Sequence, residues 1–500
     1  MPPTAPPETP RGAAPAGSQG EFKRSLSLLD ATMLVVGSMI GSGIFIVSAD
    51  IGRTMNSPGG LIAVWVATLL ITVAGALSYG ELAAAMPRAG GQYVFLREGL
   101  GHLTGFLYGW TLFLVIQTGT IAAVAVAFAK FLGVFVPAVN DRLFLPMGSL
   151  PVPGGTIDLG LSSQRVVGIV IIALLTWVNM RGLREAKWIQ RIFTIAKTAA
   201  LLGLVLLGLT IGRNADAIAT NFTHFWADLP SGSAPTPLFG IMVPALVLAF
   251  GAAMVGSLFS ADAWNNVTFA AAEVNRPQRN LPLALALGTG GVTLLYVLAN
   301  FAYLSVLKLS EIQNAPQDRV GTLALQHMFG DVGAYLMAGA ILISTFGCIN
   351  GLILAGARVY YAMVRDGVFF ERAGRISSKT HVPVWALGVQ GVWTALLTLT
   401  GSYGQLLDYV IFAALIFYVA TMVALFRLRS LRPDLERPYK AFGYPVVPGL
   451  YMLSALAIAV ILLFAKPDYS FAGLVIVLLG IPVYYVWRAS QKKNPPEPGS

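Results

Sequence analysis

The chain has 500 residues, of which 56% are hydrophobic and 11% are charged, and its mean hydropathy is +0.71. A soluble domain carries about 25% charged residues, so this composition excludes an ordinary soluble protein. The net charge of +10 does not indicate a nucleic-acid partner, because the basic residues are spread between apolar segments.

Apolar runs long enough to cross a hydrocarbon core of about 30 Å recur from end to end. They predict an all-α polytopic membrane protein with twelve transmembrane helices. The predicted spans are residues 28–52, 60–86, 104–136, 164–180, 191–212, 239–270, 283–307, 331–363, 384–400, 405–426, 446–464 and 470–487. Residues 1–24 and 489–500 have the composition of disordered cytoplasmic tails, and we expect no cleavable signal peptide.

Lysine and arginine are distributed unequally between the two sides of this topology. With the N-terminus in the cytoplasm, 23 of them fall in cytoplasmic segments and seven in outer segments. This is the positive-inside bias. It predicts a multi-pass protein of the cell membrane with both termini in the cytoplasm.

The first span is interrupted by Gly41, Ser42 and Gly43. An unpaired backbone group in hydrocarbon costs several kcal/mol, so a broken helix is tolerated only where it is buried or lines a watery cavity. Its free N–H groups can hold an anion such as a carboxylate. The alternative is a close helix–helix contact, because small residues also line such interfaces.

The sixth span contains a second interruption. Its residues 256–260 repeat the Gly-Ser pattern of residues 37–41, and the polar side chains Ser260, Asp262 and Asn265 follow. The sixth span crosses in the opposite sense to the first, and paired breaks in inverted halves indicate a transporter site near the midplane. The halves would be residues 25–212 (spans 1–5) and 239–428 (spans 6–10), with residues 446–488 (spans 11–12) appended.

Catalytic and metal-binding patterns are absent from the sequence. The single cysteine, Cys348, lies inside the eighth predicted span, so we expect no disulfide-linked partner subunit. The four histidines are far apart, and there is no complete Gly-x-Ser-x-Gly elbow or phosphate loop. We therefore expect neither an enzyme nor a bound metal or cofactor.

Loop-edge motifs add a family resemblance that covers about residues 30–490. Residues 79–82 with 86–93 resemble the signature after the second span of amino acid–polyamine–organocation transporters, and residues 273–282 resemble the signature after the sixth. The break at 41–45 and the stretch 190–197 complete the set. Leu258-Phe259, Trp264-Asn265 and Glu273 are most similar to the L-type amino acid transporter branch and its bacterial relatives.

This resemblance implies a five-plus-five inverted repeat of the leucine-transporter type, with helices 1 and 6 broken. It also implies a substrate site made of Met39, Ile40, Gly41, Ser42, Gly43, Phe259, Asp262 and Asn265. The N–H groups at 41–43 and the Ser42 hydroxyl would bind the α-carboxylate of an amino acid. The main-chain carbonyls of Met39, Ile40 and Phe259 would receive the ammonium, while the Phe259 ring would close over the substrate as a gate.

Asp262 departs from the glycine typical of the animal L-type members. An isolated carboxylate in a span costs about 2.5 kcal/mol or more, so it should face the cavity or pair. It could cap a second half-helix beginning at Ala263, or it could help to bind the substrate ammonium. Asn265 lies where the family shapes the side-chain pocket. Gln117 and Asn350 lie within predicted spans and could simply cross-link helices.

Lys197 lies six residues past Arg191, about 9 Å along the fifth helix. A lysine so near the cytoplasm can snorkel to the interface. The resemblance instead implies that Lys197 occupies the place of the second sodium ion of sodium-coupled relatives and bridges spans one and eight. A fixed ammonium there would repel Na⁺, and it could respond to protons if burial lowers its pKa.

The sequence therefore predicts a sodium-independent transporter of neutral L-amino acids that works by alternating access, as an antiporter or a proton symporter. A first alternative is a carrier of cationic amino acids or amines, with Asp262 as the counter-ion. A second is a membrane sensor that binds an amino acid without moving it. Paired broken helices favour transport over sensing.

Overall fold

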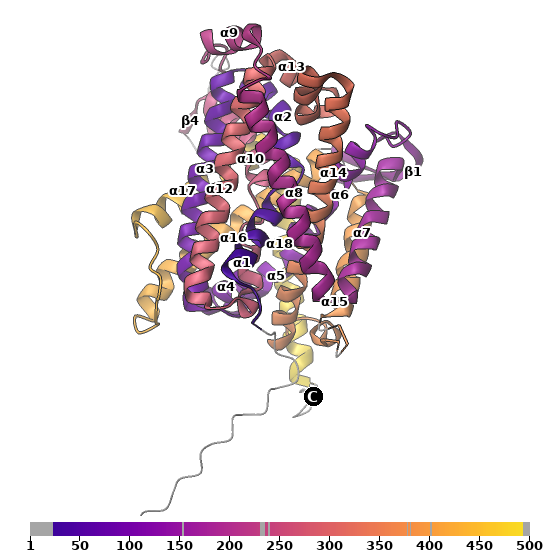
Figure 1. The fold of residues 1–500 in the computed structure, drawn as a ribbon. Helices are drawn as coiled ribbons and strands as arrows, with labels where there is room; N and C mark the ends of the chain where they lie inside the picture. Colours follow the sequence, from indigo (N-terminus) through magenta and orange to yellow (C-terminus); the bar gives the residue numbers. More distant parts are fainter. Residues whose placement is uncertain are drawn as a thin grey trace, which may run out of the picture.

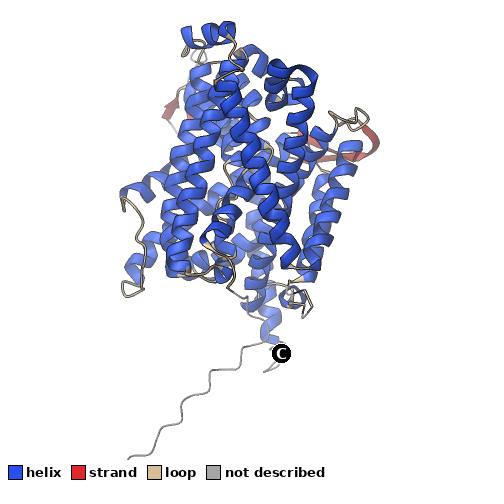
Figure 2. Ribbon diagram, in the orientation of Figure 1, coloured by secondary structure: helices blue, strands red, loops and turns tan. Residues whose placement is uncertain are grey.

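The computed structural model describes residues 24–152, 155–230, 236–238, 241–377, 379–380, 382–400 and 403–493. It is a bundle of helices with two small pairs of strands at its edge (Figures 1 and 2). The tails that the sequence predicts to be disordered lie outside the described residues, apart from Arg24 and residues 489–493.

The helices follow the apolar segments of the sequence closely. In the first half of the chain they are α1 (Leu28–Met39), α2 (Ser48–Met55), α3 (Pro58–Ala85), α4 (Gln92–Leu100), α5 (His102–Thr111), α6 (Gln117–Leu132), α7 (Ser163–Arg181), α8 (Leu183–Leu209) and α9 (Ala215–Thr223). In the second half they are α10 (Ala245–Ser260), α11 (Asn266–Phe269), α12 (Pro277–Val306), α13 (Leu309–Gln313), α14 (Val320–Arg365), α15 (Val384–Thr398), α16 (Tyr403–Leu431), α17 (Val446–Ala465) and α18 (Pro467–Lys493).

Nine helices among the described residues are long and apolar enough to cross a membrane. Three shorter apolar helices, α1, α10 and α15, accompany them. Each of the twelve predicted spans contains one of these helices, so the apolar runs located the helices well. Two of the three short helices, α1 and α10, are short because the helical conformation is interrupted at residues 40–42 and 261–265.

Local sequence signals explain where several of these helices begin. The Ser27 hydroxyl accepts a hydrogen bond from the Asp30 N–H at 3.2 Å, and the Asp30 carboxylate accepts one from the Ser27 N–H at 3.0 Å. This reciprocal capping box fixes the start of α1. Helix α3 begins at Pro58 after Ser57, whose hydroxyl accepts a hydrogen bond from the Gly60 N–H. Proline at the first helical position and serine before it are both favoured there.

The bundle has two distinct ends. One end carries α9, α13 and the antiparallel hairpin of β1 (Leu143–Val152) and β2 (Gly155–Ser162), and we call it the hairpin face (Figure 1). A second small hairpin pairs β3 (Thr236–Leu238) with β4 (Ile241–Val243). The other end holds the start of α1 and the end of α18, and we call it the terminus face.

Helix α1 lies in the middle of the packing. It contacts α12, α8 and α14, while α3 packs along α12 and α6 packs along α14. The second broken helix, α10, packs against α2, α3 and α16. The two helix interruptions are therefore surrounded by other helices, which is the environment that an interrupted helix needs at membrane depth.

Candidate functional site

The first break replaces one turn of helix with irregular backbone. Helix α1 ends because Ile40 adopts an extended conformation, with φ −73° and ψ 92°. A short 3₁₀ turn at Gly43–Phe45 follows, and the next α-helix, α2, begins at Ser48. Residues 40–47 are almost completely buried. The break predicted from Gly41, Ser42 and Gly43 is thus present at the predicted residues.

The break leaves a row of backbone donors without partners. Within the described residues, the N–H groups of residues 41–43, and that of Ile44 after them, donate to no acceptor, whereas the N–H groups of Phe45, Ile46 and Val47 bond back into the turn. Buried N–H groups are rarely left unpaired in proteins. Free N–H groups at the start of a helical turn are donors of the kind that bind anions, so the carboxylate site predicted here stays a prediction consistent with this geometry.

Close packing around the break requires glycine at two positions. A Cβ atom at Gly43 would lie 2.1 Å from Ser260 Oγ and 3.0 Å from Ser260 Cα. A Cβ atom at Gly41 would lie 3.2 Å from Cys348 Sγ. Gly43 therefore lies directly against Ser260, and the unpaired donors lie beside the end of α10.

The second break follows α10. The chain leaves the helix at Ala261, and Ala263 adopts a left-handed conformation with φ +64° before the short α11 begins at Asn266. Asp262 therefore does not cap a half-helix that begins at Ala263, and that sequence interpretation is wrong. Its carboxylate accepts a hydrogen bond from the Tyr418 hydroxyl of α16 instead.

The carbonyls predicted to bind an ammonium group are partly engaged. Met39 O accepts a hydrogen bond from the Tyr296 hydroxyl at 2.9 Å. Ile40 O accepts hydrogen bonds from Lys197 Nζ at 2.8 Å and from the Ser344 hydroxyl at 3.2 Å. A carbonyl oxygen has two lone pairs. Met39 therefore keeps capacity for a further donor, while an ammonium group would have to share Ile40 O with Lys197.

Two aromatic side chains and a serine lie together above the first break. The Ser42 hydroxyl donates to the Tyr403 hydroxyl oxygen at 3.2 Å. The Tyr403 ring meets the Phe259 ring edge to face, with centroids 6.0 Å apart. We call this ring pair the aromatic lid; the gate role predicted for Phe259 stays a prediction, and Tyr403 is a neighbour that sequence reasoning missed.

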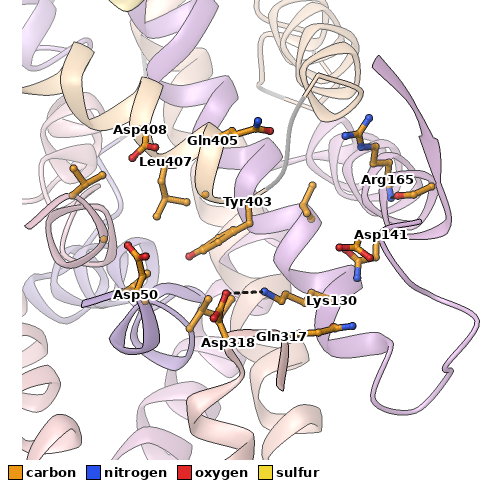
Figure 3. Close-up of a pocket in the computed structure, with 18 of the residues that line it drawn as sticks. Asp50, Lys130, Asp141, Arg165, Gln317, Asp318, Tyr403, Gln405, Leu407 and Asp408 are labelled. Atoms are coloured by element: carbon orange, nitrogen blue, oxygen red, sulfur yellow. Dashed lines mark hydrogen bonds and ion pairs between the residues drawn. The ribbon is translucent and has the colours of Figure 1, made fainter. Parts of the chain in front are cut away.

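A cavity of about 640 Å³ opens beyond this lid toward the hairpin face. Tyr403, Val47 and Gly256 line its inner part. Figure 3 shows Tyr403 in the middle of the lining, with Asp50 and Asp408 on one side and Lys130 on the other. This cavity, which we call the vestibule, borders Tyr403 and the end of the first break at Ile46 and Val47.

The vestibule is lined by equal numbers of acidic and basic side chains among the described residues. They are Asp50, Asp141, Asp318, Asp408, Arg53, Lys130, Arg165 and Lys466. Asp408 accepts from Lys466 at 2.7 Å, and Asp318 lies 2.8 Å from Arg53 and 3.9 Å from Lys130. The formal charges of the lining cancel, so the vestibule selects neither cations nor anions by net charge.

A small polar cavity of about 10 Å³ lies beside the second break, with room for roughly one water molecule. Its polar lining residues are Gln92, Gln117, Thr120, Asp262, Asn265 and Asn266. Asn265 Nδ2 donates to Gln92 Oε1 at 2.7 Å, and Gln117 Nε2 donates to Leu352 O at 2.7 Å. Gln117 cross-links helices as predicted, and Asn265 borders a cavity shaped by hydrogen-bonding groups.

Lys197 is completely buried and does not reach the membrane interface. Its Nζ donates to Gly37 O at 2.5 Å and to Ile40 O at 2.8 Å, and it lies 3.5 Å from Ser344 O. The ammonium group thus bridges α1 and α14 beside the first break, where the family resemblance placed it. Its role in coupling stays a prediction.

The site is closed toward the terminus face. Residues 25 and 26 bond to the backbone of Glu273, and the Glu273 carboxylate pairs with buried Arg358 of α14. Asp30 of α1 pairs with Arg191 of α8. The cavity beside these pairs has a volume of only about 40 Å³. The bundle therefore holds a large cavity toward the hairpin face and only a small one toward the terminus face.

Several functional contacts were not accessible from sequence. Tyr403, Tyr418 and Gln92 each bond to a predicted site residue that lies more than 150 positions away. No local pattern marks such partners, although Gln92 belongs to the motif after the second span. Among the described residues, no group of three or more His, Cys, Asp or Glu side chains could hold a metal ion.

Comparison with known proteins agrees with this geometry. Residues 26–486 match the family described as "Amino acid permease". The chain is 30% identical over 488 residues to human "Large neutral amino acids transporter small subunit 2", which covers 95% of this chain and 84% of that protein. It is 30% identical over 487 residues to mouse "Asc-type amino acid transporter 1", with 95% and 84% covered. It is 28% identical over 467 residues to the "Serine/threonine exchanger SteT" of Bacillus subtilis (strain 168), with 93% and 97% covered. The chain therefore belongs to the amino acid permease family, within the amino acid–polyamine–organocation superfamily of membrane transporters.

Proposed function

We propose that this permease carries neutral L-amino acids across the membrane by alternating access and without sodium. The observation that carries the proposal is the row of three unpaired N–H groups at residues 41–43, buried beneath an aromatic lid at the end of the vestibule. This row suits the α-carboxylate that all amino acids share. The free capacity of Met39 O suits the ammonium group, whereas Phe259 O already accepts a hydrogen bond from the Asp262 N–H at 3.1 Å.

We propose a topology of twelve crossings with both termini in the cytoplasm. The excess of Lys and Arg in the segments of the terminus face supports this orientation, which makes the hairpin face extracellular. Residues 25–212 and 239–428 would form two inverted repeats, because the broken helices α1 and α10 occupy matching places in them. Residues 446–488 would add the last two crossings. The structure then corresponds to a state open to the outside.

Three observations support a neutral substrate. The charges of the vestibule lining cancel, which suits a zwitterion without net charge. The small cavity offers amide and hydroxyl groups from Gln117, Thr120 and Asn265. The relatives are named as carriers of large neutral amino acids or as a serine/threonine exchanger. We include serine and threonine among the substrates, because their hydroxyls can bond to this lining.

A cationic substrate is the second candidate, and Asp262 is the observation that favours it. Its carboxylate is buried beside the small cavity. The Tyr418 hydroxyl, however, already donates to one of its oxygens and holds it against α16. A cationic side chain would need to compensate the buried charge directly. The hydrogen bond from Tyr418 gives the carboxylate a structural partner, so we favour neutral substrates.

The location of Cys348 bears on partner subunits. The thiol is buried, and its Sγ donates to Ser38 O at 3.2 Å inside the bundle. A disulfide to another chain requires an accessible sulfur. We therefore propose that no partner is disulfide-linked to this chain.

Uptake into proteoliposomes tests the function. We expect labelled serine or leucine to enter vesicles that hold the purified protein, with equal rates in Na⁺, K⁺ and choline buffers. Preloading the vesicles with unlabelled amino acid separates exchange from net uptake, and an imposed pH gradient tests proton coupling. Binding without uptake under all these conditions would indicate a sensor instead of a transporter.

A further inference from the structure

The side chain of Gln190 is wedged between two glycines, where α8 meets α1 and α14. It is buried on the side of the site that faces the terminus face. A Cβ atom at Gly37 would lie 2.0 Å from Gln190 Nε2, and one at Gly351 would lie 2.9 Å from Gln190 Oε1. The amide fits only because both neighbours lack a side chain.

This buried amide is only half satisfied. Nε2 donates to the Thr194 hydroxyl at 3.4 Å. Oε1 accepts no hydrogen bond from any residue that the structure describes, and less than 1 Å² of its surface is open. A cavity of about 40 Å³ borders Gln190, but the oxygen itself is covered by the packed helices. A buried acceptor without a donor raises the free energy of the packed state relative to a state in which water reaches it.

Gln190 belongs to a polar stripe on α8. Gln190, Thr194 and Lys197 follow at spacings of four and three residues, which places them on one face of the helix. Lys197 donates to two carbonyls of α1 near the break. Gln190 lies nearer the terminus face and donates nothing to α1. Lys197 therefore holds α1 beside the break and the Asp30–Arg191 pair holds its first turn, while Gln190 between them adds no hydrogen bond to α1.

We propose that Gln190 is a positioning residue that keeps the exit at the terminus face weakly closed. Movement of α1 away from α8 lets water reach the Gln190 amide, so the open state gains a hydrogen bond that the closed state lacks. A group that interacts differently in two states shifts the equilibrium between them. This inference rests on the proposed alternating access, and it assigns to Gln190 a part of the balance between the two states.

The single cysteine of the sequence can report the movement of α1 through its rate of chemical labelling. Cys348 is the single cysteine of the sequence, and it is 2% exposed. Ser38 accepts its hydrogen bond, and Gly41 packs against its sulfur. Both contacts come from the broken first helix, so this helix must move before a reagent can reach the thiol. The rate of labelling then follows the population of the open state when opening and closing are fast.

The experiment compares labelling rates in proteoliposomes of known orientation. A charged methanethiosulfonate reagent is added at the terminus face of the full-length wild type and of Gln190→Met, and Cys348→Ser gives the background. Methionine keeps the unbranched shape and removes the unpaired oxygen. We expect Gln190→Met to label about tenfold more slowly, because the cost of one unpaired buried acceptor corresponds to a factor of this order.

Gln390→Met is the matched control. Gln390 also has a buried Oε1 without a partner among the described residues, but it lies between α15 and α14, away from α1. It should label at the wild-type rate. Labelling of Gln190→Met that equals or exceeds the wild-type rate would overturn the proposal, since a purely structural role predicts looser packing and faster labelling.

Gly37→Ala supplies a test of opposite sign that does not depend on the folding of Gln190→Met. The added methyl group would press on the Gln190 amide and push α1 outward, so we expect faster labelling. An unchanged or slower rate would contradict the proposal. Labelling requires no substrate. A wild-type protein that fails to take up amino acids would therefore disprove the proposed function. The labelling rates would still test the proposed role of Gln190.

Discussion

The contact between Gly43 and Ser260 allows the carboxylate site to be tested quantitatively. A Cβ atom at Gly43 would lie 2.1 Å from Ser260 Oγ, whereas ordinary contact begins near 3.4 Å. Ser260 Cβ would lie 2.7 Å away whatever the position of Oγ, so the two segments must separate by about 0.7 Å in Gly43→Ala. Rotation of the Ser260 side chain cannot relieve the clash, because Ser260 Cα would also lie only 3.0 Å away.

A displacement of this size moves the three unpaired N–H groups away from the substrate carboxylate. A misplacement of about 1 Å can cost roughly 100-fold in a positioned reaction, or about 2.7 kcal/mol. We expect Gly43→Ala to lose roughly that much in substrate affinity, and we expect Gly43→Val to bind nothing measurable. The assay is binding of labelled serine to purified protein, combined with uptake into proteoliposomes.

A double-mutant cycle isolates the contact. Ser260→Gly removes the clashing hydroxymethyl group, so Gly43→Ala combined with Ser260→Gly should recover much of the lost affinity. The coupling free energy should fall at the upper end of about 0.5–3 kcal/mol. Gly203→Ala on α8 is the control, because a Cβ atom there meets nothing within 4 Å. Near-normal binding by a well-folded Gly43→Val protein would refute the assignment of the site.

Three further predictions concern the lid, the ammonium group at the break and the buried carboxylate. Tyr403→Phe removes the partner of the Ser42 hydroxyl and should weaken substrate affinity about threefold to tenfold, as measured by the KM of uptake; an unchanged KM would remove Tyr403 from the site. Lys197→Met deletes the bridge between α1 and α14 and should abolish uptake in a protein that still folds. Full activity of this variant would show that the bridge is dispensable. Asp262→Asn keeps a partner for the Tyr418 hydroxyl, so uptake of neutral amino acids should change less than about threefold. A loss beyond about a hundredfold would instead assign the carboxylate to substrate binding.

The apolar segments and both helix breaks were predictable from sequence for physical reasons. Lipid requires every backbone group to be satisfied, so spans read as long apolar runs and breaks read as clustered glycine and serine. Gly41–Gly43 and the polar residues after Ser260 therefore located the two helix interruptions in the sequence. The position of the Lys197 side chain was not predictable from physical reasoning alone, because the same sequence allows a lysine that snorkels to the interface and a lysine that is buried. The family resemblance favoured the buried position, and the structure shows it.

The partners of the site residues were not predictable, because they depend on tertiary packing. The Ser42–Tyr403 bond spans 361 positions, and Tyr403 reads in the sequence as an ordinary aromatic at the edge of a span. The expectation that Asp262 caps a half-helix failed for a local reason. The left-handed backbone at Ala263 delays the next helix to Asn266, so the carboxylate is free to meet Tyr418.

Competition during uptake tests the central claim most directly. Proteoliposomes with the wild-type protein take up labelled serine in the presence of a panel of unlabelled neutral amino acids, arginine, lysine and putrescine. The proposed site predicts that neutral L-amino acids compete, that arginine and putrescine do not, and that replacing Na⁺ by choline changes nothing. Stronger inhibition by arginine or putrescine than by every neutral amino acid, or a steep dependence on Na⁺, would contradict it.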